Sequence, residues 1–444
     1  MYNRMKLVLV VALLAAGTAL PGAAAGAGDA NGPPADRVEL ASASPSVGQS
    51  DAAGGEHGHG TPVDLPDVPA PTITSPPSEA ELEDIAVAAE EFGLSMAEAV
   101  GQYGWRDNFS LLAGEVAGDF PDDFARAEIA NGNTAWIAFA GSQPQETRQL
   151  VEQFRSTFPH VTVQVRPNVG YTATELNDAV VAIHKATMAR PEIVDAVTEY
   201  LASDNAISVS ASTRHRGPRL SVEELRTELD LPEVDRLPKS VAIRVSVAEG
   251  VNLSGDDSWT YHYGGEALSS CTSGFGVRYG NHVNGTRGIS TAGHCGNSQT
   301  DDGRTLTYQG GYDGYWGDFQ WHTGPGVESD DFYSGNSTSL EVNRRDVSSD
   351  AWANTGNWLC TNGMTTKKEC DTVRNTGVCS GENCGMFGME NREQAGGDSG
   401  APVFNGNKAY GLHEGWYTSG GKARDTKSQA RYMPTAINCW VAYS

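Results

Sequence analysis

Two short segments of this 444-residue chain contain side chains that could carry out nucleophilic chemistry together. Residues 291–295 read TAGHC and contain His294, and residues 396–402 read GGDSGAP and contain Ser399. A serine hydroxyl is a weak nucleophile near neutral pH and needs a neighbouring base, which an imidazole can supply because its pKa lies close to that pH. A carboxylate that holds the imidazole in the correct tautomer would complete the set. The two segments therefore predict acyl transfer through a covalent intermediate on Ser399.

The order of these residues argues against one large class of serine hydrolases. In α/β-hydrolases the serine comes first along the chain, whereas here His294 precedes Ser399. The sequence around Ser399 is Gly-x-Ser-x-Ala, which also differs from the Gly-x-Ser-x-Gly turn of those enzymes. A secreted esterase is therefore the disfavoured alternative.

Together the two segments resemble the chymotrypsin-like serine proteases, specifically the secreted bacterial branch of streptogrisins and α-lytic protease. The resemblance is strong over about residues 260–444 and weaker over the preceding region, which is similar to the pro-region of α-lytic protease. It implies a secreted, monomeric serine endopeptidase that acts on protein or peptide substrates without a cofactor or metal. It also implies that the amides of Gly397 and Ser399 form an oxyanion hole. The pro-region would assist folding of the catalytic domain and then inhibit that domain until it is cleaved off.

The carboxylate partner of His294 has to be chosen among several aspartates. Asp318 opens the strand-like segment GDFQW and follows His294 by 24 residues, a spacing similar to that of the bacterial proteases. Asp313 lies in the turn-like segment GYDG and remains the alternative. Asp301 and Asp302 are too close to the histidine segment and are expected in a solvated turn. We therefore expect Asp318 to complete the catalytic set.

All seven cysteines lie after residue 251 and are expected to form disulfides in an exported protein. Their number is odd, so at least one has no partner within the chain. A zinc site is disfavoured because residues 360–384 contain neither a CxxC pair nor a histidine. The resemblance implies that Cys271 pairs with Cys295 and Cys360 with Cys370. The partners of Cys379, Cys384 and Cys439 stay open.

The resemblance also assigns a specificity pocket. In the family its floor comes from a residue about six before the nucleophile, which is Glu393 here, and Glu414 and Trp416 would belong to its wall. An acidic floor would favour a Lys or Arg side chain through a charge-assisted contact. The alternative is that Glu393 is a surface carboxylate and that the pocket accepts apolar side chains.

Asp398, next to the nucleophile, is by resemblance a buried carboxylate that stabilises the oxyanion loop. Such a group needs a partner when it is buried. Related proteases often place an arginine where this chain has Thr361. The sequence therefore leaves the partner of Asp398 unidentified.

Four regions follow one another along the chain. Residues 1–25 form a signal peptide, with Arg4 and Lys6 before an apolar run and an Ala-x-Ala site at its end. Residues 26–78, rich in Ala, Gly, Pro and Ser, predict a flexible linker. Residues 79–250 predict an α+β pro-region, with cleavage expected between about residues 247 and 263. Its expected helices are 79–92, 145–157 and 173–188, and its expected strands are 134–140, 161–165, 206–211 and 240–247.

Residues 251–444 predict an all-β catalytic domain, because short alternating strands separated by turn residues replace the helices. Its expected strands are 274–278, 288–291, 306–309, 401–404 and 409–413, with a helix hinted at 434–441. The resemblance specifies two antiparallel six-stranded barrels with the catalytic residues in the cleft between them.

The charge of the chain limits its partners. The formal net charge of −25 argues against binding nucleic acid through phosphates. After the signal no stretch of about 20 apolar residues remains, so no membrane association is expected. A second alternative function is an inactive protease-like binding protein, although such proteins usually lose the histidine or the serine, and both are present here.

Overall fold

The computed structural model describes residues 76–130, 132–190, 193–213, 232–248, 263–301, 303–324, 329–335 and 344–443. The signal peptide, nearly all of the linker, Asp302 and most of the expected cleavage segment lie outside these residues. The described residues all belong to one compact unit by their internal contacts. No helix in the described ranges is long and apolar enough to cross a membrane.

The helices of the N-terminal half begin where the sequence places their caps. Helix α1 (Glu79–Glu91) starts after Ser78, and α5 (Ala173–Met188) starts after Thr172. Each has a capping box, in which the cap hydroxyl accepts from the backbone amide of a glutamate three residues later and that glutamate's carboxylate accepts from the cap amide. Helix α4 (Gln145–Thr157) has the predicted bounds. The sequence analysis did not predict α2 (Met96–Tyr103) and α3 (Arg106–Asp119).

Two three-stranded sets accompany these helices. Strands β1 (Phe124–Ala130), β2 (Thr134–Phe139) and β3 (Thr162–Arg166) form one sheet that shares a hydrophobic core with α3 and α4. Strands β4 (Ile193–Leu201), β5 (Ala206–Thr213) and β6 (Ala242–Ala248) form the other set, which packs with α5. Of these six strands, β1 and β4 were not predicted.

Six strands of the C-terminal half pair in a closed ring. The pairings run from β16 through β19, β20, β21, β18 and β17 and back to β16. Apolar side chains of its strands, such as Leu359, Val373, Phe387, Val403 and Tyr410, form one buried hydrophobic cluster together with Leu111 of α3. The bounds are β16 (Trp358–Gly363), β17 (Lys367–Ser380), β18 (Asn383–Met389), β19 (Pro402–Asn405), β20 (Lys408–Ser419) and β21 (Lys422–Gln429).

The remaining large sheet of this half has five strands in the order β11-β12-β8-β7-β22. Where the sequence predicted two six-stranded barrels, the described residues therefore show one ring of six strands and one sheet of five. The bounds are β7 (Gly276–Tyr279), β8 (Thr286–Thr291), β11 (Thr307–Gly314), β12 (Gly317–Thr323) and β22 (Cys439–Val441). Short elements complete the described chain: η1 (Ala202–Asp204), α7 (Pro232–Asp235), η2 (Gly293–Cys295), β9 (Thr300–Asp301), β10 (Arg304–Thr305), β13 (Asp331–Tyr333), β14 (Arg344–Asp346), β15 (Ser349–Asp350) and η3 (Ala430–Tyr432).

The C-terminal helix is shorter than the sequence suggested. Helix α8 (Met433–Ile437) ends at Asn438, whose φ of 53° is left-handed and cannot continue a right-handed helix. Residues 439–441 instead form β22, which pairs with β7. Sheet pairing therefore overrides the helical pattern at the end of the chain.

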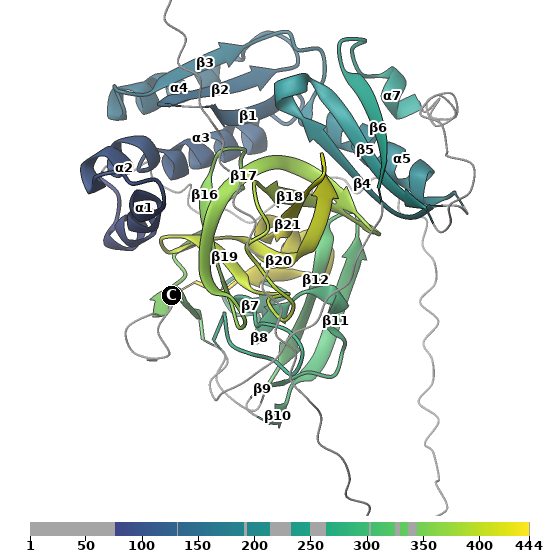
Figure 1. Ribbon diagram of the computed structural model, residues 1–444. Helices are drawn as coiled ribbons and strands as arrows, with labels where there is room; N and C mark the ends of the chain where they lie inside the picture. Colours follow the sequence, from purple (N-terminus) through teal and green to yellow (C-terminus); the bar gives the residue numbers. More distant parts are fainter. Residues whose placement is uncertain are drawn as a thin grey trace, which may run out of the picture. The chain divides into compact units, whose positions relative to one another are not determined.

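The two halves share one sheet. Strand β4 pairs antiparallel with the end of β17, with Cys379 opposite Thr198 and Ser380 opposite Val197 (Figure 1). Helices α1 and α2 also contribute Ile85 and Tyr103 to the hydrophobic cluster that contains Trp358 of β16. The N-terminal half is thus attached through backbone pairing and through a common core.

Candidate active site

The structure brings His294, Asp318 and Ser399 into one chain of hydrogen bonds. The imidazole Nδ1 lies 2.5 Å from Asp318 Oδ2, and Nε2 lies 3.0 Å from Ser399 Oγ. His294 is on η2 after β8 and Asp318 is on β12, both beside the five-stranded sheet, while Ser399 precedes β19 of the six-stranded ring. The imidazole is placed to take the serine proton while the carboxylate holds its other nitrogen.

Glycine makes the close approach of these segments possible. A Cβ at Gly293 would lie 2.4 Å from Asp318 Oδ1, so a side chain there would push the histidine segment away from the carboxylate. Gly400 has a φ of +89°, and its Cβ would lie 2.1 Å from Thr291 Oγ1. Lack of space excludes larger residues at both positions, and at Gly400 the backbone angle excludes them as well.

The geometry selects Asp318 over Asp313. The two residues lie directly opposite each other on β12 and β11, but only the Asp318 carboxylate is hydrogen-bonded to the imidazole. The expectation that Asp301 lies in a solvated turn is wrong, because Asp301 is 1% exposed on the short strand β9. A bridge from Leu268 to this strand covers it.

The surroundings of His294 favour its protonated form. Burial by itself would lower the pKa of the imidazole, but the hydrogen bond and negative charge of Asp318 outweigh it. Glu414 and Asp313 add weaker electrostatic attraction, and the net effect raises the pKa of His294 above its ordinary value. The site therefore stabilises the imidazolium that forms when the serine proton is transferred.

The hydrogen-bond partners of Asp398, which the sequence left open, come from a turn and from its own loop, while Lys427 acts on it through charge. Its Oδ1 accepts from the amide of Thr365 at 2.7 Å, and its Oδ2 accepts from the hydroxyl of Thr366 at 2.7 Å and the amide of Ala395 at 2.8 Å. These donors come from the β16–β17 turn and from the nucleophile loop itself. The carboxylate therefore ties the loop to the ring without an arginine.

The loop that carries the nucleophile leaves two amides available. Gly397 has a φ of 96°, a conformation that favours glycine, and its carbonyl accepts from Thr272 Oγ1 at 2.8 Å. Among the described residues no acceptor is found for the amides of Gly397 and Ser399. Two unengaged donors next to a nucleophile are what a developing oxyanion requires.

The three residues expected in the specificity pocket have different surroundings, although Asp425, which accepts from the Glu393 amide, is paired opposite Trp416. The side chain of Glu393 is exposed, and its amide donates to Asp425 Oδ2 at 3.0 Å. Burial of Glu91 and Glu369, together with the negative charge of Glu393, raises the pKa values of those two side chains. Trp416 lies against the guanidinium of Arg392, 4.4 Å from the ring centroid. Glu414 lies beside the imidazole, and which side chain the pocket accepts stays a prediction.

A buried charged cluster on β20 and β21 was not predicted from the sequence. Lys427 on β21 is 1% exposed, and its Nζ lies 2.8 Å from His413 Nδ1 and 3.8 Å from Asp425 Oδ2. Burial and the charge of Lys427 hold the pKa of His413 well below its usual range. A lone lysine in an alternating strand carries no sequence signal for such burial, because only the pairing of β20 with β21 places it opposite His413.

The disulfides implied by the resemblance are confirmed. Cys271 is bonded to Cys295 and Cys360 to Cys370. Cys379 pairs with Cys384 across the β17–β18 turn, and Cys439 is buried without a disulfide partner. The first of these bonds is directly next to His294 and restrains its segment.

Potential metal ligands in the site are already engaged. His294, Asp318 and Glu414 offer donor atoms within 4.8 Å of one another, but both ring nitrogens of His294 are within hydrogen-bond distance of side-chain oxygens. The neighbouring sulfurs of Cys271 and Cys295 are bonded to each other. The donor set is therefore that of a hydrogen-bond relay.

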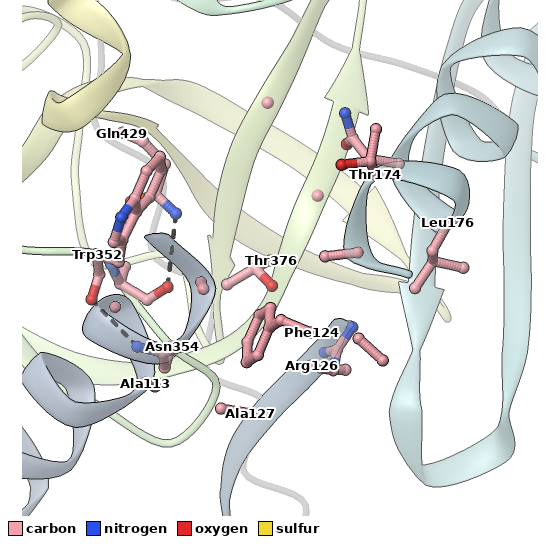
Figure 2. A pocket seen from close by; sticks show the side chains of 18 of the residues that line it. Ala113, Phe124, Arg126, Ala127, Thr174, Leu176, Trp352, Asn354, Thr376 and Gln429 are labelled. Atoms are coloured by element: carbon pink, nitrogen blue, oxygen red, sulfur yellow. Dashed lines mark hydrogen bonds between the residues drawn. The ribbon is translucent and has the colours of Figure 1, made fainter. Parts of the chain in front are cut away.

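A cavity of about 290 Å³ lies away from these residues (Figure 2). Its lining includes Ala113 of α3, Phe124 of β1 and Leu176 of α5, together with Trp352 and Thr376 of the C-terminal half. Neither His294 nor Ser399 lines it. The cavity is a packing gap between the two halves of the unit.

Comparisons with known proteins give distant structural similarities. The structure is similar to Thermobifida fusca protease A, with 21% identity and a TM-score of 0.34. The match covers 41% of the present chain and 99% of the Thermobifida protease. Nocardiopsis protease is similar as well, with 20% identity over 41% of this chain and 98% of the Nocardiopsis chain, and a TM-score of 0.34. A glutamic acid specific serine protease has 24% identity over 40% of this chain and 99% of its own chain, with a TM-score of 0.34. No protein-family model and no curated protein matches the sequence. Similarities at this level establish no activity, so the site is interpreted from its own geometry.

Proposed function

We propose that this chain is a secreted serine endopeptidase, made as a proenzyme, that hydrolyses peptide bonds through an acyl-enzyme on Ser399. The observation that carries the proposal is the hydrogen-bond chain from Asp318 through His294 to Ser399. The two amides of Gly397 and Ser399, which have no acceptor among the described residues, support it.

The proposed reaction follows from these positions. Ser399 Oγ attacks the peptide carbonyl carbon as its proton passes to His294 Nε2, and the carbonyl oxygen becomes an oxyanion held by the two amides. The imidazolium returns that proton to the leaving amine, so the peptide C–N bond breaks and the acyl-enzyme remains. Water then attacks the ester with His294 again as base, which releases the acid and regenerates the serine. No step uses a metal or cofactor.

Buried ion pairs between the halves support the proenzyme part of the proposal. Asp84 of α1 is fully buried, and its carboxylate lies 2.8 Å from Arg345 Nη1 and 2.6 Å from Lys368 Nζ. Lys408 of β20 lies 2.5 Å from Asp107 and 3.0 Å from Glu81. A buried cation of the C-terminal half is stable only when a carboxylate is paired with it, and here the N-terminal half provides that carboxylate. We infer that residues 79–250 act as folding partner and, until cleaved, as inhibitor.

The three disulfides support export, because such bonds persist mainly outside the reducing cytosol. Export agrees with the predicted signal peptide. We therefore place the active protein outside the cell.

A covalent probe of active serines tests the function. The processed protein should react with a fluorophosphonate, and Ser399→Ala should abolish the labelling. Hydrolysis of casein then separates the endopeptidase from an esterase, which would be labelled but would cleave only esters. Absence of labelling in a correctly folded, processed wild type would favour the inactive binding protein.

A further inference from the structure

Glu414 places a second carboxyl group beside the proposed catalytic residues. It lies on β20, and its backbone carbonyl is 3.4 Å from Ser399 Oγ. Its carboxyl oxygen, a ring nitrogen of His294 and a carboxyl oxygen of Asp318 all lie within 4.8 Å of one another. The hydroxyl of Thr426 on β21 donates to Glu414 Oε2 and thereby holds the carboxyl group on this side of the strand.

We infer that Glu414 is a positioning residue of the site, which shares with Asp318 the stabilisation of the His294 imidazolium and thereby sets the acid limit of activity. This inference rests on the proposed function and concerns the regulation of that same site by pH. Asp318 holds the imidazole through a direct hydrogen bond, whereas Glu414 acts on it through charge at a longer distance.

The charged groups around Glu414 come from several elements. Asp318 on β12 and Asp313 on β11 are negative and disfavour its ionised form, while His294 on η2 favours that form when protonated. The cations Lys427 and Arg392 act on His413, the preceding residue, whose side chain is bonded to Lys427. Loss of hydration is the largest effect, and with Asp318 it raises the pKa of Glu414 to about 7 against the opposing bond from Thr426.

The consequence is a carboxyl group that changes charge in the working range of the imidazole. Above about pH 7 Glu414 is ionised and its charge raises the pKa of His294. Below that pH Glu414 takes up a proton and its negative charge no longer raises the pKa of His294, whereas Asp318 still does. Two interacting groups therefore govern the acid limb, and the apparent pKa values belong to the pair.

The variant that isolates this effect is Glu414→Gln, which removes the charge and keeps the shape. We expect the pKa of His294 to fall by about half a unit to one unit, because one of three nearby negative charges is lost. The acid limb of the kcat/KM profile should move to lower pH by the same amount. Glu369→Gln, which removes an exposed carboxylate from β17, is the matched control and should leave both quantities unchanged.

Two readouts keep this test separate from the proposed function. Titration of the His294 imidazole by NMR in the full chain carrying Ser399→Ala needs no activity, while the rate profile is measured on the processed protein with a chromogenic peptide. An inactive wild type would refute the proposed function, yet the NMR shift would still decide the coupling. An imidazole pKa that is unchanged or raised in Glu414→Gln overturns the inference.

A second pair of variants, at Thr426, tests the same inference if Glu414→Gln does not fold. Thr426→Val removes the bond that favours ionised Glu414 and should lower the pKa of His294 in the same direction by a smaller amount. Thr426→Ser retains the hydroxyl and should retain the wild-type acid limb. Identical titrations of His294 in Thr426→Val and wild type would contradict the inference.

Discussion

At the scale of single residues, the proposed chemistry depends on which of two facing carboxylates reaches the imidazole. Asp313 and Asp318 are paired across β11 and β12, so their side chains share one neighbourhood. Only Asp318 is within hydrogen-bond distance of His294 Nδ1. A neutral amide at this position would stabilise the wrong tautomer, with the proton on Nε2, which then cannot accept from the serine.

Asp318→Asn should therefore leave the fold intact and lower kcat by about 10⁴. The measurement is the rate of peptide hydrolysis by the processed variant, with circular dichroism as the check on folding. Asp313→Asn is the matched control and should change kcat far less. The reverse pattern, with Asp313→Asn impaired and Asp318→Asn active, would show that Asp313 is the catalytic carboxylate.

A buried histidine outside the site makes a prediction about acid stability. His322 on β12 is fully buried, and burial lowers the pKa of its imidazole to about 4, while neither ring nitrogen has a hydrogen-bond partner among the described residues. Between about pH 6.5 and pH 4 the unfolded chain therefore binds a proton that the folded chain does not. This site contributes stability above about pH 6.5 and loses it as the pH falls towards 4.

Replacing the ring with an apolar one should remove this dependence. His322→Phe should increase the free energy of unfolding, relative to the parent protein, by more at pH 5 than at pH 7.5. Urea unfolding of both proteins in the Ser399→Ala background measures the difference, and comparison of the two pH values cancels the packing change. An equal effect at both pH values would show that His322 does not titrate as described.

At the scale of elements, the attachment of β4 to β17 is more than backbone pairing. Glu199 of β4 is 1% exposed, and its carboxylate accepts from Arg374 at 2.5 Å and from Asn375 at 2.7 Å. The hydroxyls of Tyr417 and Ser419 on β20 donate to the same carboxylate. A strand of the N-terminal half thus supplies the acceptor for four donors of the six-stranded ring.

Glu199→Gln should weaken the joint of the two halves, because it leaves the guanidinium of Arg374, which is partly buried, without its counter-charge. Breaking such a pair costs about 3–5 kcal/mol. Urea unfolding of the full chain with Ser399→Ala measures the loss. Glu152→Gln, at an exposed ion pair on α4, is the control and should cost less than about 1 kcal/mol. Equal stability of Glu199→Gln and wild type would mean that the joint does not depend on this charge.

At the scale of the whole molecule, the C-terminal half depends on contacts between distant parts of the chain. The ring closes only when β16 meets both β17 and β19, and β22 at the end of the chain pairs with β7 at the start of that half. Non-local pairing of this kind folds slowly. The N-terminal half contacts β16, β17 and β20 together, so it can hold strands of the ring in place during folding.

Residues 253–444 expressed alone should therefore give inactive or aggregated protein. Addition of residues 79–250 in trans should restore folding, and activity should appear once that segment is removed or degraded. Soluble yield and casein hydrolysis measure the outcome. Normal yield and activity of residues 253–444 without the N-terminal segment would refute its role as a folding partner.

Local patterns by themselves determined a large part of this protein. The caps at Ser78 and Thr172 specify the starts of α1 and α5, because a cap satisfies amides of the first helical turn from within the same few residues. The segments around His294 and Ser399 specify the proposed chemistry, because each contains its functional side chain and the glycines that let it approach. Strand context favoured Asp318, and the structure places that residue against the imidazole.

What only the tertiary structure decided involves residues far apart in the chain. The acceptor role of Glu199, the turn that satisfies Asp398 and the burial of Lys427 opposite His413 all follow from strand pairing and register. Glu414 shows the physical reason most directly. Its place in the sequence is compatible with a pocket wall or with a solvent-facing side chain, because adjacent residues of a strand face opposite sides. Glu414 is the extra residue of a bulge in β20, between His413 opposite Lys427 and Gly415 opposite Thr426. This bulge and the proximity of β12 bring its carboxyl group close to His294.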